Sequence, residues 1–157
     1  MEIINTSKGI GGQLTEFRKL VKDSKRIVFI GTAGFCTPFA ELMAFVLRSS
    51  DKETIFVPDL RSDEARMIVP TSHGMQLGDK AEPFADTVVL LGGLAMPKIG
   101  VHPEEMEGIV ADLLKDVENK LIIGVCFQSL LINANWLDFI DFDYIIDADL
   151  TNEVKEV

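Results

Sequence analysis

The sequence is short of the residue types on which several classes of protein depend. Of its 157 residues only two are cysteines and two are histidines. The cysteines, Cys36 and Cys126, have no framework spacing, which excludes a disulfide-rich secreted fold. No C-x-x-C or similar pair is present, so the sequence predicts no metal site. The third glycine of a dinucleotide-binding fingerprint is also absent, because Gly31 and Gly34 are not followed by another at the required spacing.

Basic residues are scarce as well. The chain has 15 lysines and arginines against 25 acidic residues, a formal net charge of −10. A surface of this kind cannot neutralise a run of phosphates, which excludes nucleic acid and an anionic membrane as partners. No apolar run approaches the roughly 18 residues that span a bilayer. The first seven residues lack the basic start and apolar core of a signal peptide, so we expect a cytoplasmic protein.

The chain does contain strand and helix patterns in alternation. Apolar runs predict strands at residues 26–30, 54–57, 87–91, 121–125 and 144–146. Helices are predicted between them, including one that opens on Thr37-Pro38, with Thr37 as its N-cap, and one that begins at Pro103. Alternation predicts one α/β domain over residues 1–157, with a polar tail at 151–157. We expect a three-layer sandwich around a mainly parallel, doubly wound sheet. The expected strand order is second, first, third, fourth, fifth, with the first strand in the middle.

The segment from residue 60 to 83 interrupts this alternation. Two short strands at residues 66–78 predict a hairpin, either at an edge of the sheet or as an arm over the site. Five apolar residues gather there: Met67, Ile68, Val69, Met75 and Leu77. Self-pairing of the hairpin across a two-fold axis would bury them, which predicts a homodimer. An acidic assembly protein without catalysis is therefore one of the functions that remain open.

Ligands of open parallel sheets bind beyond the carboxyl ends of the strands. The loops that end there predict a pocket for a small anionic or nucleotide-like ligand; the cofactor, if there is one, is not identified. Glycines in these loops would let a ligand approach main-chain N–H groups, although a tight turn that serves packing alone is an equal alternative. The predicted ligand-binding residues are Gly31, Thr32, Gly34, Thr37, Asp59, Gly92, Gly93 and Lys98.

The two cysteines are the candidate reactive groups. Residues 121–129, LIIGVCFQS, resemble the nucleophile elbow of glutamine amidotransferases, which makes a cysteine-dependent enzyme a further alternative. The sequence departs from that pattern at Gln128, where a glycine is expected, and no histidine follows Cys126. A buried structural cysteine is favoured for this reason. The strand order also argues against a disulfide between Cys36 and Cys126.

Three blocks together carry a family resemblance: GTAGFCTPFAELMAF, VVLLGGLAMPKIG and IIGVC. They resemble a family of unknown function found in methanogenic archaea, and they span most of residues 26–126. The resemblance implies a small cytoplasmic α/β protein without an established biochemical role. It implies no catalytic residues.

Overall fold

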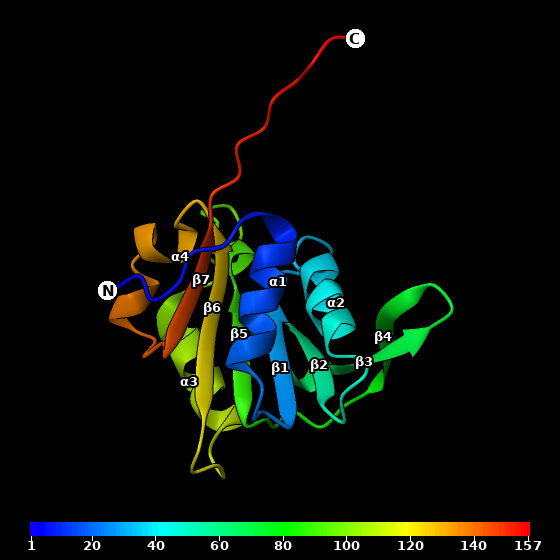
Figure 1. Ribbon diagram of the computed structural model, residues 1–157. Helices are drawn as coiled ribbons and strands as arrows, with labels where there is room; N and C mark the ends of the chain where they lie inside the picture. The colour runs from blue at the N-terminus through cyan, green and yellow to red at the C-terminus, as the bar shows by residue number, and fades with distance from the viewer.

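The computed structural model describes all 157 residues as seven strands and four α-helices around one sheet (Figure 1). The strands are β1 (Arg26–Gly31), β2 (Glu53–Pro58), β3 (Arg66–Thr71), β4 (Gly74–Lys80), β5 (Thr87–Leu91), β6 (Leu121–Phe127) and β7 (Tyr144–Ala148). The helices are α1 (Gly9–Leu20), α2 (Thr37–Val46), α3 (Pro103–Leu113) and α4 (Leu130–Asn133), with 3-10 turns at Ser62–Glu64, Gly92–Ala95 and Trp136–Asp138. None of the helices is long and apolar enough to cross a bilayer.

The sheet has the order β4-β3-β2-β1-β5-β6-β7, with β1 in the middle. Five neighbouring strands, β2, β1, β5, β6 and β7, are parallel. Strand β3 is antiparallel to both of its neighbours, β2 and β4. The α/β class, the central first strand and the predicted order of the parallel strands are confirmed. From β1 the chain goes first to β2 on one side and later returns to β5 on the other. The topological switch point therefore lies between the carboxyl ends of β1 and β5.

Two apolar cores lie on opposite faces of the sheet, because successive side chains of a strand point to opposite faces. On β1, Ile27 and Phe29 belong to the core beneath α1 and α2, whereas Val28 and Ile30 belong to the core beneath α3 and α4. Figure 1 shows these two helical layers on either side of the sheet. The three-layer arrangement buries Ile27, Val28, Phe29 and Ile30 of the strand that precedes the switch point completely.

The predicted hairpin is formed by β3 and β4, and β4 is an edge of the sheet. Only two residue pairs join β3 to β2, and the Thr54 hydroxyl adds a hydrogen bond of 3.2 Å to the Ile68 carbonyl. Ile68 and Met75 are buried in the core beneath α2. Of the apolar residues expected to need a partner, only Leu77 is exposed. The basis for self-pairing through the hairpin is weaker as a result, since Ile68 and Met75 already pack in the chain's own core.

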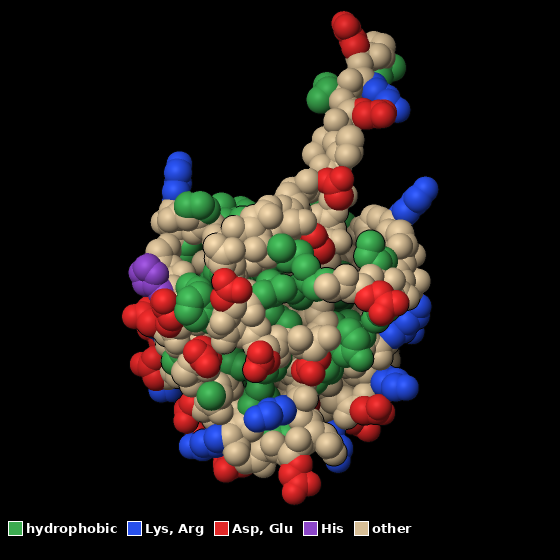
Figure 2. All heavy atoms as spheres, turned by 90° about the vertical axis from the view of Figure 1, so that its left-hand side faces the viewer, with side chains coloured by type: hydrophobic (Ala, Val, Ile, Leu, Met, Phe, Trp, Pro, Cys, Tyr) green, Lys and Arg blue, Asp and Glu red, His purple; other side chains and the backbone are tan.

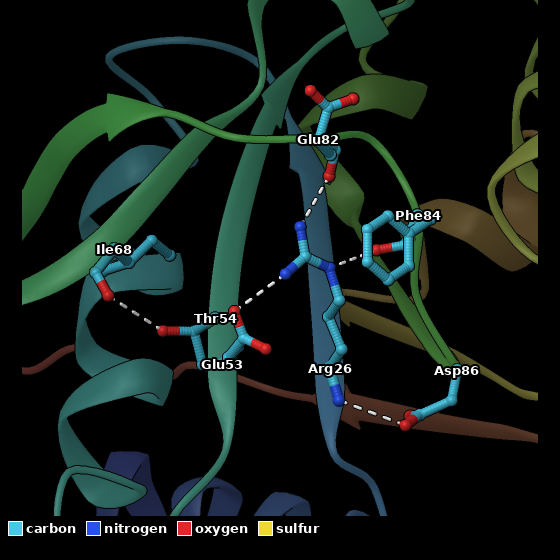
Figure 3. A network of polar contacts seen from close by, with 7 residues as sticks. All are labelled: Arg26, Glu53, Thr54, Ile68, Glu82, Phe84 and Asp86. Carbon is cyan, nitrogen blue, oxygen red and sulfur yellow. Dashed lines mark hydrogen bonds and ion pairs between the residues drawn. The ribbon is translucent and has the colours of Figure 1, made fainter.

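The connection from β4 to β5 contains no helix. Residues 81–86 run over one face of β2 and β1 without a helix and reach the amino end of the sheet at Asp86, and Arg26 holds them there (Figure 3). Its guanidinium donates to the carbonyls of Glu82 and Phe84 at 2.7 and 2.8 Å and pairs with Glu53 at 2.8 Å. The same group lies 3.9 Å from the centre of the Phe84 ring. A helix usually forms the connection between two parallel strands. Here the connection has no helix, and the hydrogen bonds of Arg26 fix it to the sheet.

Candidate functional site

The carboxyl ends of β2, β1, β5 and β6 lie side by side in the parallel part of the sheet. One residue of interest lies at or just beyond each of these ends: Asp59 after β2, Thr32 after β1, Gly92 after β5 and Cys126 in β6. The register places Gly31 of β1 opposite Pro58 of β2, and Asp59 donates its backbone N–H to the Gly31 carbonyl at 2.9 Å. The loops that the sequence placed next to one another are therefore neighbours in the structure.

Cys36 occupies the crevice at the switch point. A Cβ on Gly31 would lie 2.4 Å from the Cys36 Cβ, and a Cβ on Gly93 would lie 2.4 Å from the Cys36 Sγ. Real Cβ atoms do not approach other atoms this closely, so both glycines are needed for the thiol to fit. The room that these two glycines leave is therefore filled by the protein's own side chain. Phe35, which is 58% exposed, lies beside Gly93 above the thiol.

Cys126 repeats this arrangement one strand further along. A Cβ on Gly92 would lie 2.5 Å from the Cys126 Cβ. Its sulfur contacts a carboxylate oxygen of Asp147 at 3.5 Å. Both cysteines are free and buried. A pair of thiols thus packs against three of the four glycines that had been assigned to a ligand.

Burial raises the pKa of both thiols. For Cys36, burial outweighs the nearby backbone of Thr32 and Gly93, which lowers the pKa, and the Asp59 carboxylate raises it further. For Cys126, burial and then the charge of Asp147 raise the pKa from 9.0 to about 11. Nucleophilic cysteines need the opposite shift, since the thiolate is the reactive form. His73 lies in the hairpin turn and His102 just before α3, so neither histidine belongs to the elements that hold the thiols.

The raised pKa of Cys126 predicts a loss of stability in alkali. A fold that favours the neutral thiol gains stability below pH 9.0 and loses it as the pH rises toward 11. Urea unfolding across this range should show a steeper loss of free energy in the wild type than in Cys126→Ala. The comparison cancels the lysine and tyrosine titrations common to both proteins. Equal slopes in the two proteins would mean that Cys126 ionises as readily in the fold as in the unfolded chain.

Two buried oxygens at the same edge have no oxygen or nitrogen as a hydrogen-bond partner, and only the Cys36 thiol lies close to one of them, the Thr32 hydroxyl. They are Thr32 Oγ1, at the end of β1, and Asp59 Oδ1, at the end of β2. The other carboxylate oxygen of Asp59 is 3.4 Å from Arg61. Asp59 also has a left-handed backbone, with φ of 53°. Unpaired buried polar atoms are rare in folded proteins, and each one indicates an unseen partner or a functional strain.

The loop between β1 and α2 is closed by its own hydrogen bonds. Cys36, not Thr37, occupies the N-cap position, so the N-cap expected at Thr37 is wrong. The Thr37 hydroxyl instead accepts a bond of 3.0 Å from the Gly34 N–H, across a turn in which Gly34 has φ of 82°. Pro38 has no N–H to offer. The start of α2 therefore presents few free donors to an anion, and the exposed Lys98 makes no ion pair.

A polar hollow lies at the ends of β6 and β7. It has a volume of about 390 Å³ and is lined by Gln128, Ser129, Asn133, Asp147, Ala148 and Asp149. Asp147 accepts from the Ser129 N–H at 2.9 Å and from its hydroxyl at 2.6 Å. Gln128 and Ser129 are consecutive left-handed residues, with φ of 53° and 55°. The sequence places these residues at the edge, but nothing in its pattern predicts their left-handed backbone. No three His, Cys, Asp or Glu side chains anywhere in the chain converge as a metal site requires.

The fold and this edge define an open, mainly parallel α/β protein with its loops gathered at one switch point. Residues 8–151 match the family described as an uncharacterized protein conserved in archaea (DUF2124), and the chain belongs to it. An uncharacterized protein of Methanothermobacter thermautotrophicus is 40% identical over 154 residues, covering 98% of each chain. An uncharacterized protein of Methanocaldococcus jannaschii is 39% identical over 151 residues, covering 94% of this chain and 90% of its own.

The same fold is seen in a crystal structure of a protein of unknown function from Methanothermobacter thermautotrophicus. That chain is 38% identical and matches with a TM-score of 0.91, covering 100% of this chain and 99% of its own. The family that the sequence blocks resemble and the α/β fold are thus confirmed.

Proposed function

We propose that this protein binds a small nucleotide-like ligand at the carboxyl edge, beside the switch point. The observation that supports it is the buried Asp59 Oδ1, which has no hydrogen-bond partner, next to the buried Thr32 hydroxyl, which has only the weakly hydrogen-bonding Cys36 thiol beside it. Leaving a buried polar group unpaired costs about 1–3 kcal/mol, which a ligand would recover on binding. The free Cys36 thiol next to the site suits a reducing cytoplasm.

The chemistry of the two oxygens indicates which part of a ligand they meet. A carboxylate accepts hydrogen bonds only, so Asp59 requires hydroxyl or amine donors such as those of a ribose. Thr32 can donate or accept. Arg61 is half exposed, lies beside Asp59 and pairs with Glu64 at 2.8 Å, so an anionic group of the same ligand would meet it in place of Glu64. Hydroxyls therefore bind between β1 and β2, and the anionic group lies outside.

Two substitutions test this role, because they separate binding from stability. Thr32→Val keeps the shape and removes the unpaired hydroxyl, so the unliganded protein should be as stable as the wild type or more so. Asp59→Asn keeps a residue that tolerates a left-handed backbone. Each should weaken ligand binding at least about tenfold, a change of about 1.4 kcal/mol.

The measurement is a thermal-shift screen of nucleosides, nucleotides and dinucleotides, followed by calorimetric titration of any hit. A ligand at 100 times its Kd stabilises the fold by about 2.7 kcal/mol, which such a screen detects. Asp79→Asn, an exposed carboxylate on β4, is the matched control and should bind as the wild type does. The proposal fails if nothing in the panel binds, if Asp59→Asn binds unchanged, or if Thr32→Val destabilises the unliganded protein.

A further inference from the structure

Helix α1 begins at the carboxyl edge of the sheet with its first donors free. Figure 1 shows its start at the same edge as the root of the C-terminal tail. The N–H groups of Gly9, Ile10 and Gly11 donate to no atom of the chain, and Gly12 is the first to donate, to the Lys8 carbonyl at 3.1 Å. The side chain of Lys8, at the N-cap, makes no capping hydrogen bond, and the first turn has no acidic residue. Free N–H groups at the positive end of a helix dipole attract an anion.

A buried amide is directed toward this helix start. Gln13 is only 6% exposed, and its Nε2 atom is buried without a hydrogen-bond partner. Gln13 and Phe17 form the buried face of α1. Helical side chains lean toward the N-terminus of their helix and cover the preceding turn, which for Gln13 begins at Gly9. An amide nitrogen is a donor only, so the partner that Gln13 lacks is an acceptor at the free end of the helix.

The three glycines of this helix start differ in what requires them. Gly9 has φ of 69°, a left-handed backbone that favours glycine. A Cβ on Gly12 would lie 2.8 Å from the Ser7 side chain, so packing requires that glycine. Neither reason applies to Gly11, which is helical and has nothing within 4 Å of the place where its Cβ would be. Glycine is a poor helix former, but it lets a ligand approach the backbone closely, and the space beside Gly11 is open.

The charge at the start of α1 also differs from that of much of the surface. Figure 2 shows acidic side chains spread over the side of the molecule that carries α3, α4 and β7. Lys8, in contrast, is exposed and pairs with no carboxylate. Three backbone N–H groups, one buried amide and one ammonium thus meet at the same helix start, and all of them are donors.

We propose that the start of α1 binds the phosphate group of a small molecule, held by the N–H groups of Gly9, Ile10 and Gly11, the Gln13 amide and the Lys8 ammonium. A phosphate group carries a charge of about −1.5 to −2 and three strong acceptor oxygens. It can therefore accept from donors that approach from several directions. A carboxylate has one charge and two oxygens, so it leaves some of these donors unpaired.

Titration of the full chain with inorganic phosphate, followed by amide NMR, locates the site. The signals of Ile10, Gly11 and the Gln13 side-chain amide should shift in a saturable way, with a Kd below about 10 mM. Acetate at equal ionic strength should bind at least about tenfold more weakly. Shifts confined to the surroundings of Arg61, shifts without saturation, or equal binding of acetate would overturn the proposal. Glycerol phosphate, titrated in the same way, distinguishes the sources: tighter binding than inorganic phosphate identifies a phosphate ester as the ligand, and weaker binding identifies free phosphate.

Substitutions then test the donors one at a time. Gln13→Met keeps the unbranched shape and removes the unpaired amide, so the unliganded protein should be at least as stable as the wild type, while phosphate binds at least about tenfold more weakly. Lys8→Gln should weaken binding about three- to tenfold. Lys22→Gln makes the same charge change beyond the other end of α1 and should alter binding less than about twofold.

Three results would contradict the site. They are unchanged phosphate binding by Gln13→Met, a loss of stability in unliganded Gln13→Met, and equal effects of the two lysine variants. Asp59→Asn should bind inorganic phosphate as the wild type does, because Asp59 follows β2 and takes no part in the start of α1. The phosphate site and the nucleotide-like ligand at Asp59 therefore stand or fail independently.

Discussion

Gly93→Ala should lower the free energy of unfolding by about 1–3 kcal/mol, the usual cost of overpacking a well-filled core. The added Cβ would lie 2.4 Å from the Cys36 Sγ, and both residues are buried at the switch point. The thiol cannot move away easily, because its own Cβ is already in close contact with Gly31. Urea unfolding monitored by circular dichroism measures the change. Gly108→Ala is the matched control, since Gly108 is exposed on α3 with nothing within 4 Å. It should be neutral or stabilising.

Cys36→Ala should rescue Gly93→Ala, because it removes the sulfur with which the new Cβ collides. It should not rescue Gly31→Ala, where the collision is with the Cys36 Cβ, which an alanine retains. The two double mutants therefore give coupling energies that differ by about 1 kcal/mol or more. If Cys36→Ala rescues both glycine variants equally, or neither, the thiol is not what requires glycine at position 93.

These glycines also show where prediction from the sequence reaches its limit. The strand of residues 26–30, the helix that begins at Thr37-Pro38 and the strand order follow from local patterns and from the handedness of crossovers. The loops after β1 and β5 were placed together for the same reasons. A glycine in the sequence, however, indicates only that a Cβ would have no room there or that φ is positive. Whether a ligand or Cys36 fills that room depends on contacts between loops about sixty residues apart.

For a related reason, the sequence could not predict that the oxygens of Thr32 and Asp59 are buried without an oxygen or nitrogen partner. Both residues were among the predicted ligand contacts, yet their types alone do not distinguish them from Thr37, whose hydroxyl is used within its own turn. A polar atom becomes a candidate for binding when the fold buries it without a partner, and that depends on every neighbour at once. The left-handed backbone of Gln128 and Ser129 is likewise set by their bonds to strand β7 rather than by residue type.

The course of the crossover between β4 and β5 could be predicted even less from the sequence. A parallel connection usually contains a helix, and the sequence offers no helical pattern at residues 81–86. This segment is held by Arg26, at the start of β1, about sixty residues away along the chain. In the sequence Arg26 is an ordinary charged residue before a strand. Its side chain is only 12% exposed, and its fork of donors meets two carbonyls and one carboxylate.

Arg26→Ala should therefore destabilise the fold by about 2–3 kcal/mol, the cost typical of losing hydrogen bonds to a charged group. The carbonyls of Glu82 and Phe84 lose their donor, Glu53 loses its partner and the Phe84 ring loses the cation stacked on it. Urea unfolding measures the total. Amide exchange of residues 85 and 86 should quicken more than that of the central strand β1, because the crossover opens first.

Two control variants separate the geometry of the arginine from its charge. Arg26→Lys keeps the charge and the chance of pairing with Glu53, but an ammonium cannot reproduce the planar fork, so most of the loss should remain. Arg48→Ala removes an arginine that also stacks on a phenylalanine, Phe45, and donates to its carbonyl, but from the exposed surface of α2. That loss should stay below about 1 kcal/mol. If Arg26→Lys were as stable as the wild type, charge alone would hold the crossover, and the fork of hydrogen bonds to Glu82 and Phe84 would contribute little.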